Sequence, residues 1–279
     1  MFRKLPVTHI ILFLLTFITT VVAGAINSGI DPISEPHRIY EGMPFALTLI
    51  TILLVHEFSH YLASKIHRTE ATLPYFIPAP SIIGTFGAFI KMKSPINTRE
   101  ALIDIGASGP LAGFFISVIA CIAGLSMSEI VKLDSSENSF GLGSSILFSI
   151  MTKIIIGNFP DNHDILLHPI AFAGWIGLFV TSMNLIPIGQ LDGGHIAYAI
   201  FGERQKLVSK LLVALLMILG IFLWQGWIIW AVLMIIMGTK HPPVLYWHEP
   251  VSRSRTSVAI ISLIVLILTF VPMPFKIEL

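Results

Sequence analysis

Long apolar runs separated by short polar segments dominate this 279-residue chain. A helix that crosses a bilayer needs about 20 mostly apolar residues. Runs of this kind lie at residues 8–25, 44–66, 102–125, 169–191, 207–237 and 258–270. The pattern predicts an all-α polytopic membrane protein with about six transmembrane helices.

Two of these runs allow a second interpretation. The run 207–237 is too short for two full crossings at about 20 residues each, but it fits either one tilted crossing or a short hairpin broken near Trp224-Gln225-Gly226. The total is therefore six spans or seven, and we favour six. The basic start and apolar run at the N-terminus also fit a signal peptide, but the spans that follow favour an uncleaved anchor.

The segment 73–94 is apolar but does not fit a helix. It contains Pro74, Pro78 and Pro80, and prolines at this density break helices. Non-helical backbone at membrane depth is tolerated only where protein or a water-filled cavity covers it. We therefore expect a small re-entrant β element between the second and third spans, although an interfacial loop remains the alternative. Its free edge, which includes Gly84 and Gly87, could receive a substrate as an added strand.

Composition supports lipid as the surrounding medium. Only 12% of the residues are charged and 54% are hydrophobic, and the net charge of +1 gives no sign of a nucleic-acid partner. The single cysteine, Cys121, lies in an apolar run, so it can make neither an internal disulfide nor a cysteine-rich metal site. We interpret it as a packing residue.

The distribution of Lys and Arg predicts the orientation of the spans. Arg3 and Lys4 place the N-terminus in the cytoplasm, the basic segment 65–99 is also cytoplasmic, and the acidic segment 129–164 is external. The second and fourth spans then both run toward the cytoplasm, and their C-terminal ends share one membrane face.

The strongest chemical signal is His56-Glu57-Phe58-Ser59-His60, an HExxH motif inside the second apolar run. Residues four apart lie on one face of a helix, so both imidazoles can reach the same metal ion. Glu57 is then close enough to take a proton from a water molecule on that metal. The alternative is a pair of histidines that are hydrogen-bonded between packed helices.

Catalytic zinc normally has three protein ligands and a water, so one ligand is still missing. Asp192 is the candidate, because it follows an apolar run and an unpaired carboxylate at membrane depth is expensive. Pro187, Gly189, Gly193 and Gly194 would unwind the helix around it. We interpret the neighbouring His195 as a surface or supporting residue and assign no role to His163, His168 or His241.

With these motifs the chain resembles the site-2 protease family of intramembrane zinc metalloproteases. HEFSH (56–60) and NLIPIGQLDGG (184–194) match the two motifs of the family, with Gly189 in place of its second proline. GTFGA (84–88) is similar to its re-entrant segment, and GPLAG (109–113) is similar to its third span.

This resemblance implies that His56, His60 and Asp192 bind one catalytic Zn2+ and that Glu57 is the general base and acid. It implies that Asn184 hydrogen-bonds the substrate or the oxyanion, although a helix-packing amide is the alternative. The implied partners are a transmembrane protein substrate and the lipid bilayer.

We expect one membrane-embedded protease domain over residues 1–279. Its parts are a catalytic core at 44–200, an external loop at 128–168 and C-terminal spans at 207–270. No PDZ domain is expected. The expected location is the cell membrane, with the active-site face in the cytoplasm.

Three other functions are compatible with parts of this sequence. A metal-binding transporter or channel could use the same four polar residues as a transport site. An inactive scaffold is disfavoured because every catalytic position is filled. A protease with a glutamate as third ligand is disfavoured because Glu203 and Glu249 both fall in loops.

Overall fold

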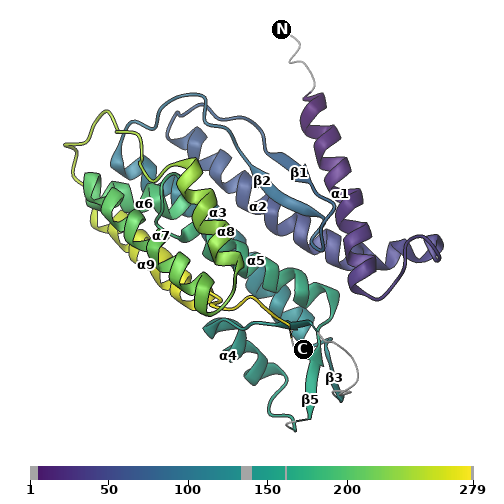
Figure 1. Ribbon diagram of the computed structural model, residues 1–279. Helices are drawn as coiled ribbons and strands as arrows, with labels where there is room; N and C mark the ends of the chain where they lie inside the picture. The colour runs from purple at the N-terminus through teal and green to yellow at the C-terminus, as the bar shows by residue number, and fades with distance from the viewer. Residues whose placement is uncertain (1–5, 133–139, 161, 278–279) are drawn as a thin grey trace.

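A helical bundle makes up most of the protein, and small two-stranded sheets lie at its margins (Figure 1). The computed structural model describes residues 6–132, 140–160 and 162–277. The helices are α1 (Val7–Asn27), η1 (Pro36–Gly42), α2 (Met43–Ile66), α3 (Arg99–Leu125), α4 (Ile146–Ile155), α5 (Pro169–Leu185), α6 (Asp192–Phe201), η2 (Gly202–Arg204), α7 (Gln205–Phe222), α8 (Gly226–Met237) and α9 (Arg253–Thr269).

The strands form three antiparallel pairs within the described ranges. They are β1 (Tyr75–Pro78) with β2 (Thr85–Phe89), β3 (Glu129–Lys132) with β5 (His163–Leu166), and β4 (Phe140–Leu142) with β6 (Phe275–Ile277). A mostly helical membrane protein with a small β element between its second and third spans is therefore confirmed.

In the described part of the chain, four helical stretches are long and apolar enough to cross a membrane: Val7–Asn27, Pro36–Ile66, Arg99–Leu125 and Asp192–Phe222. The expected span 169–191 is shorter than predicted, because α5 has 17 residues and ends at Leu185. Ile186 leaves helical geometry with a ψ of 124° before Pro187, as expected for a residue that precedes proline. The chain then makes a short unwound turn before α6 begins.

The tract 207–237 forms the hairpin that the sequence left as an alternative. Helix α7 ends at Phe222 and α8 begins at Gly226, so the single tilted crossing is wrong. The two legs touch closely, since a Cβ on Gly220 would lie 2.7 Å from the backbone nitrogen of Ile228. With 12 residues, α8 is about 18 Å long, which is less than a full bilayer crossing of about 30 Å.

The β1–β2 hairpin lies against α1, which gives its irregular backbone the cover that it needs at membrane depth. Thr19 Oγ1 donates to the carbonyl oxygen of Gly84 at 2.6 Å, and Asn27 Nδ2 donates to that of Ile82 at 2.8 Å. Gly84 has a φ of +80°, and a Cβ there would lie 2.5 Å from the carbonyl oxygen of Thr19. The hairpin is therefore part of the folded bundle, while its depth relative to the membrane stays a prediction.

Helix α3 occupies the centre of the bundle and packs against α2, α5, α6 and α9. The main apolar core joins α2 and α5 and includes Phe45, Leu49 and Trp175, all nearly inaccessible to solvent. Large apolar side chains such as Leu14 and Ile18 of α1 are exposed instead, which is expected of surface that faces lipid.

Parts of the orientation prediction concern residues outside the described ranges. Arg3 and Lys4, on which the orientation partly depends, lie outside the described residues, as do residues 133–139 of the acidic segment. The orientation and the single-domain boundaries stay predictions. Within the expected external loop 128–168, the described residues include α4, β3 and β5.

Candidate metal centre and active site

Helix α2 presents two buried histidines on one face. His56 and His60 are 4% and 6% exposed, and their Nε2 atoms lie 3.1 Å apart. The spacing follows from the helix, because residues four apart are neighbours along one side. Two imidazoles held this way inside an apolar helix need a shared partner, since buried polar groups are unfavourable when unpaired.

Asp192, the first residue of α6, supplies that partner from a distant part of the chain. Its Oδ2 lies 3.4 Å from Nε2 of His56 and 3.3 Å from Nε2 of His60. The three side chains could hold a metal ion together, because one ligand atom from each lies within 4.8 Å of the other two. The Asp192 side chain is 19% exposed.

The spacing of these three atoms fits one zinc ion. Zinc binds histidine nitrogen and carboxylate oxygen at about 2.0–2.1 Å in tetrahedral geometry, which puts neighbouring ligand atoms about 3.3–3.4 Å apart. The three distances of 3.1, 3.3 and 3.4 Å are close to that edge length. Two histidines and one carboxylate also match the donor set of catalytic zinc sites, which keep a fourth position open.

A backbone carbonyl fixes the tautomer of His60. Nδ1 of His60 lies 2.7 Å from the carbonyl oxygen of Ile105 in α3. Because a carbonyl oxygen can only accept, Nδ1 must carry the proton, and Nε2 of the neutral ring keeps its lone pair for a metal. Ser108 Oγ donates to the same carbonyl oxygen at 2.9 Å, which further fixes its position.

Two glycines of α3 make room for the imidazoles. A Cβ on Gly109 would overlap the ring of His60, and a Cβ on Gly113 would lie 3.1 Å from Nδ1 of His56. These glycines belong to the GPLAG segment. Its small residues therefore let α3 approach α2 closely enough for Ile105 to reach His60.

The unwound turn before Asp192 is supported by α7. Gln205 and Ser209 are buried there; Gln205 Nε2 donates to the carbonyl oxygen of Gly189 at 3.3 Å, and the Gly189 N–H donates to Ser209 Oγ at 3.1 Å. Gly189 has a φ of +53°, so a glycine suits this turn. These bonds satisfy backbone groups that the break in the helix leaves without helical partners.

Glu57 and Asn184 complete the polar lining. Glu57 is 6% exposed, and the backbone amide of Ile90, just after β2, faces its carboxylate. Asn184, near the end of α5, places Nδ2 3.4 Å from Nε2 of His56. The end of β2 and the end of α5 therefore both reach the cluster.

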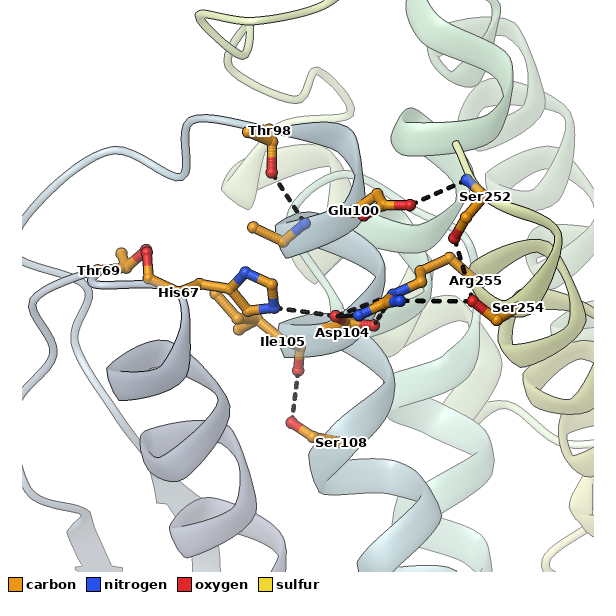
Figure 2. A network of polar contacts seen from close by, with 11 residues as sticks. His67, Thr69, Thr98, Glu100, Asp104, Ile105, Ser108, Ser252, Ser254 and Arg255 are labelled. Carbon is orange, nitrogen blue, oxygen red and sulfur yellow. Dashed lines mark hydrogen bonds and ion pairs between the residues drawn. The ribbon is translucent and has the colours of Figure 1, made fainter. Parts of the chain in front are cut away.

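A second polar network surrounds Asp104, the residue before Ile105, and joins α2, α3 and α9 (Figure 2). Asp104 of α3 accepts from Nε2 of His67, at the end of α2, at 2.9 Å, and from Nη2 of Arg255 in α9 at 3.1 Å. Glu100 accepts from the backbone N–H of Ser252 at 2.9 Å. These bonds hold the end of the metal-binding helix and the start of α9 on α3.

Comparison with known proteins identifies the family. The model of peptidase family M50 matches residues 44–225, which is well over half of the chain and contains all four motif residues. The chain belongs to peptidase family M50. This confirms the resemblance to the site-2 proteases.

Several plant proteins are similar to this chain over most of its length. The "probable zinc metalloprotease EGY1, chloroplastic" of Arabidopsis thaliana is 31% identical over 82% of this chain and 43% of its own length. EGY2 of the same plant is 29% identical over 84% of this chain and 42% of its own length, and EGY2 of Oryza sativa subsp. indica is 28% identical over 85% and 44%. The chain spans less than half the length of these relatives.

The structure brings together the three residues that the sequence predicted as metal ligands and places Glu57 and Asn184 beside them. Gly84 and Gly87 lie in the β1–β2 hairpin. Sequence reasoning missed the supports of the site, which are the Ile105 carbonyl, the Gln205–Ser209 pair and the Asp104 network. The sequence gives no clear signal for the Gln205–Ser209 pair, because these residues lie among Arg204, Lys206 and Lys210 at the polar start of α7.

Proposed function

We propose that this chain is a zinc-dependent protease that cuts peptide bonds within or near transmembrane segments of other membrane proteins. The observation that carries the proposal is the meeting of His56, His60 and Asp192 beside Glu57 in the interior of a membrane bundle. Membership of the M50 family supports the peptidase chemistry. The names of the plant relatives support zinc as the metal.

In the proposed site His56, His60 and Asp192 hold one zinc ion. The ion would polarise the scissile carbonyl and make water a better nucleophile near neutral pH. Glu57 accepts the proton of the attacking water at its carboxylate and returns it to the leaving nitrogen. Asn184 directs its side-chain amide toward the same space, where it can donate to a developing oxyanion. The packed glycines and apolar helices exclude bulk water, which strengthens these interactions.

A transmembrane substrate must unwind before it is cut, because a helix hides its amides in internal hydrogen bonds. We propose that the free edge of β2 supplies replacement bonds by strand addition. Its C-terminal end leads to Ile90, whose amide faces Glu57. An extended segment paired along this edge would therefore run toward the proposed catalytic residue.

Gly84 and Gly87 of this hairpin are not equally suited to test strand addition by mutation. Gly84 packs on α1, so a side chain there would disturb the fold as well as any substrate. Gly87 has a φ of +96°, and no atom beyond its two chain neighbours lies within 4 Å of a Cβ built on it. Asparagine tolerates a positive φ better than most other non-glycine residues, so Gly87→Asn is the mildest replacement. If the Gly87→Asn protein and proteins with bulkier residues at position 87 all cleaved substrate at the wild-type rate, strand addition at this edge would be wrong.

The decisive experiment replaces Glu57 by glutamine. Tagged candidate membrane substrates are co-expressed with the wild type, with Glu57→Gln and with Glu249→Gln, which makes the same chemical change at an exposed loop position. We expect zinc-dependent fragments from the wild type and the control only, with full zinc retention in Glu57→Gln. A transporter would instead show altered metal flux and no cleavage in any variant.

The compartment and the orientation are further parts of the proposal. The basic segment 65–99 continues to favour a cytoplasmic active-site face in the cell membrane, while the names of the relatives assign those proteins to chloroplasts. Accessibility labelling of single cysteines introduced in loops, in a Cys121→Ser background, would test both.

A further inference from the structure

Residues 238–252, here named the strap, connect α8 to α9 and lie outside the family-matched region 44–225 (yellow-green loop in Figure 1). The strap touches the segment that carries Asp192 at both ends. The carbonyl oxygen of Gly238 lies so close to Gly189 that a Cβ there would overlap it, and a Cβ on Gly202 would lie 2.8 Å from the ring of Trp247. The strap thus contacts this segment both in the unwound turn before α6 and at the C-terminal end of α6.

Between these contacts the strap makes a directed hydrogen bond to α6. Nε2 of His241 lies 2.6 Å from Nδ1 of His195, and Nδ1 of His241 lies 2.6 Å from the carbonyl oxygen of Pro242. The carbonyl can only accept, so Nδ1 of His241 carries its proton, and Nε2 of the neutral ring must accept. His195 is therefore the donor, and His241 is the acceptor.

His241 is held in place on its other sides. Its ring stacks on Tyr198 with a centroid distance of 4.5 Å and an interplanar angle of 19°. The strap is also fixed to the start of α3, where the backbone N–H of Tyr246 donates to Asn97 at 2.9 Å and the Arg99 guanidinium lies 4.5 Å from the Trp247 ring centroid. A side chain presented so firmly can orient the group that it contacts.

We propose that His241 is a positioning residue for the third metal ligand. His195 lies in the first turn of α6, where its N–H donates to Leu191 at 3.0 Å, and Asp192 begins that turn. By accepting from His195, His241 fixes the rotation of the turn and the direction in which Asp192 presents its carboxylate to His56 and His60. The inference rests on the proposed metal site. Partners that hydrogen-bond a metal ligand directly change metal affinity about 10- to 100-fold when removed, and His241, which acts through His195, should have a smaller effect of about 3- to 10-fold.

The test measures zinc affinity directly, without a protein substrate. Full-length wild type, His241→Ala, His241→Gln and His248→Ala are purified in detergent, and zinc is titrated away with a chelator. Gln places an amide oxygen near the position of Nε2 and keeps an acceptor, whereas His248 is an exposed histidine of the same strap and serves as control. We expect about a 3- to 10-fold loss of affinity for His241→Ala, near wild-type affinity for His248→Ala, and recovery of most of the loss for His241→Gln.

Cobalt(II) substitution gives a second readout that general destabilisation would not move. We expect the visible spectrum of His241→Ala to shift and that of His241→Gln to resemble the wild type. If His241→Ala binds zinc as tightly as His248→Ala, or if His241→Gln loses as much affinity as His241→Ala, the positioning role is refuted. If the wild type itself binds no zinc, the proposed metal site fails instead, so the two failures are distinct.

Discussion

Replacing Gly109 of α3 by alanine should displace the proposed metal ligand His60. In Gly109→Ala the new Cβ would overlap the His60 ring, so the ring would have to move by roughly 1 Å. A misplacement of that size can lower the catalytic rate about 100-fold. In the activation free energy this corresponds to about 2.7 kcal/mol, and zinc affinity should fall with the rate because His60 is one of the proposed ligands. The retreat would also strain the bond from His60 to Ile105, which is 2.7 Å long.

Gly113→Ala is the matched comparison on the same helix. Its Cβ would lie 3.1 Å from His56 Nδ1, a contact that a shift of a few tenths of an ångström relieves. We expect less than about a tenfold loss of zinc affinity for this variant. Both variants replace glycine by alanine inside α3, and this replacement favours the helix by about 1 kcal/mol in each case. A difference in zinc affinity between them could therefore not come from a change in helix stability.

The assay is chelator competition on purified protein, with cleavage of a membrane substrate measured in parallel. The account requires Gly109→Ala to lose both zinc and cleavage while Gly113→Ala keeps most of both. Equal zinc affinity in Gly109→Ala and the wild type would refute the reasoning, because His60 would then not occupy the position that the close approach of α3 defines.

Three further predictions follow from contacts around the site. Gln205→Leu removes the side-chain donor to the Gly189 carbonyl and to Ser209 Oγ, so we expect a stability loss of about 1–3 kcal/mol in thermal unfolding and weaker zinc retention, whereas an unchanged melting temperature would mean that Gln205 does not support the turn. Asp104→Asn weakens a partly exposed ion pair with Arg255, so we expect a loss of about 1 kcal/mol, and Arg255→Gln should match it if this pair is responsible. Removal of zinc by a chelator should stop cleavage and lower the melting temperature, and readdition of zinc should restore both.

The sequence was most informative where local spacing carries the chemistry. His56, Glu57 and His60 follow from helix periodicity, and Asp192 stood out because a carboxylate beside an apolar run needs a partner. Helix ends were less predictable. α5 ends six residues before the apolar run does, because Pro187 and Gly189 override hydrophobicity in the segment that carries Asp192.

The supporting contacts were hidden from sequence reasoning for a physical reason. Ile105 acts through a backbone carbonyl that every residue possesses, so its identity gives no signal. His241 and Asp104 act through partners far away along the chain, and only the fold brings His195, His67 and Arg255 to them. Periodicity reports which face of a helix is buried, but it does not report what that face meets.

The central claim is that one zinc ion is held by two imidazole nitrogens and one carboxylate oxygen. X-ray absorption at the zinc edge, recorded on the purified full chain, tests this most directly. The account predicts one zinc per chain, with nitrogen and oxygen neighbours at about 2.0–2.2 Å and an imidazole signature that Asp192→Ala leaves in place while zinc affinity falls. A first shell containing sulfur at about 2.3 Å, or substoichiometric zinc in active protein, would contradict it.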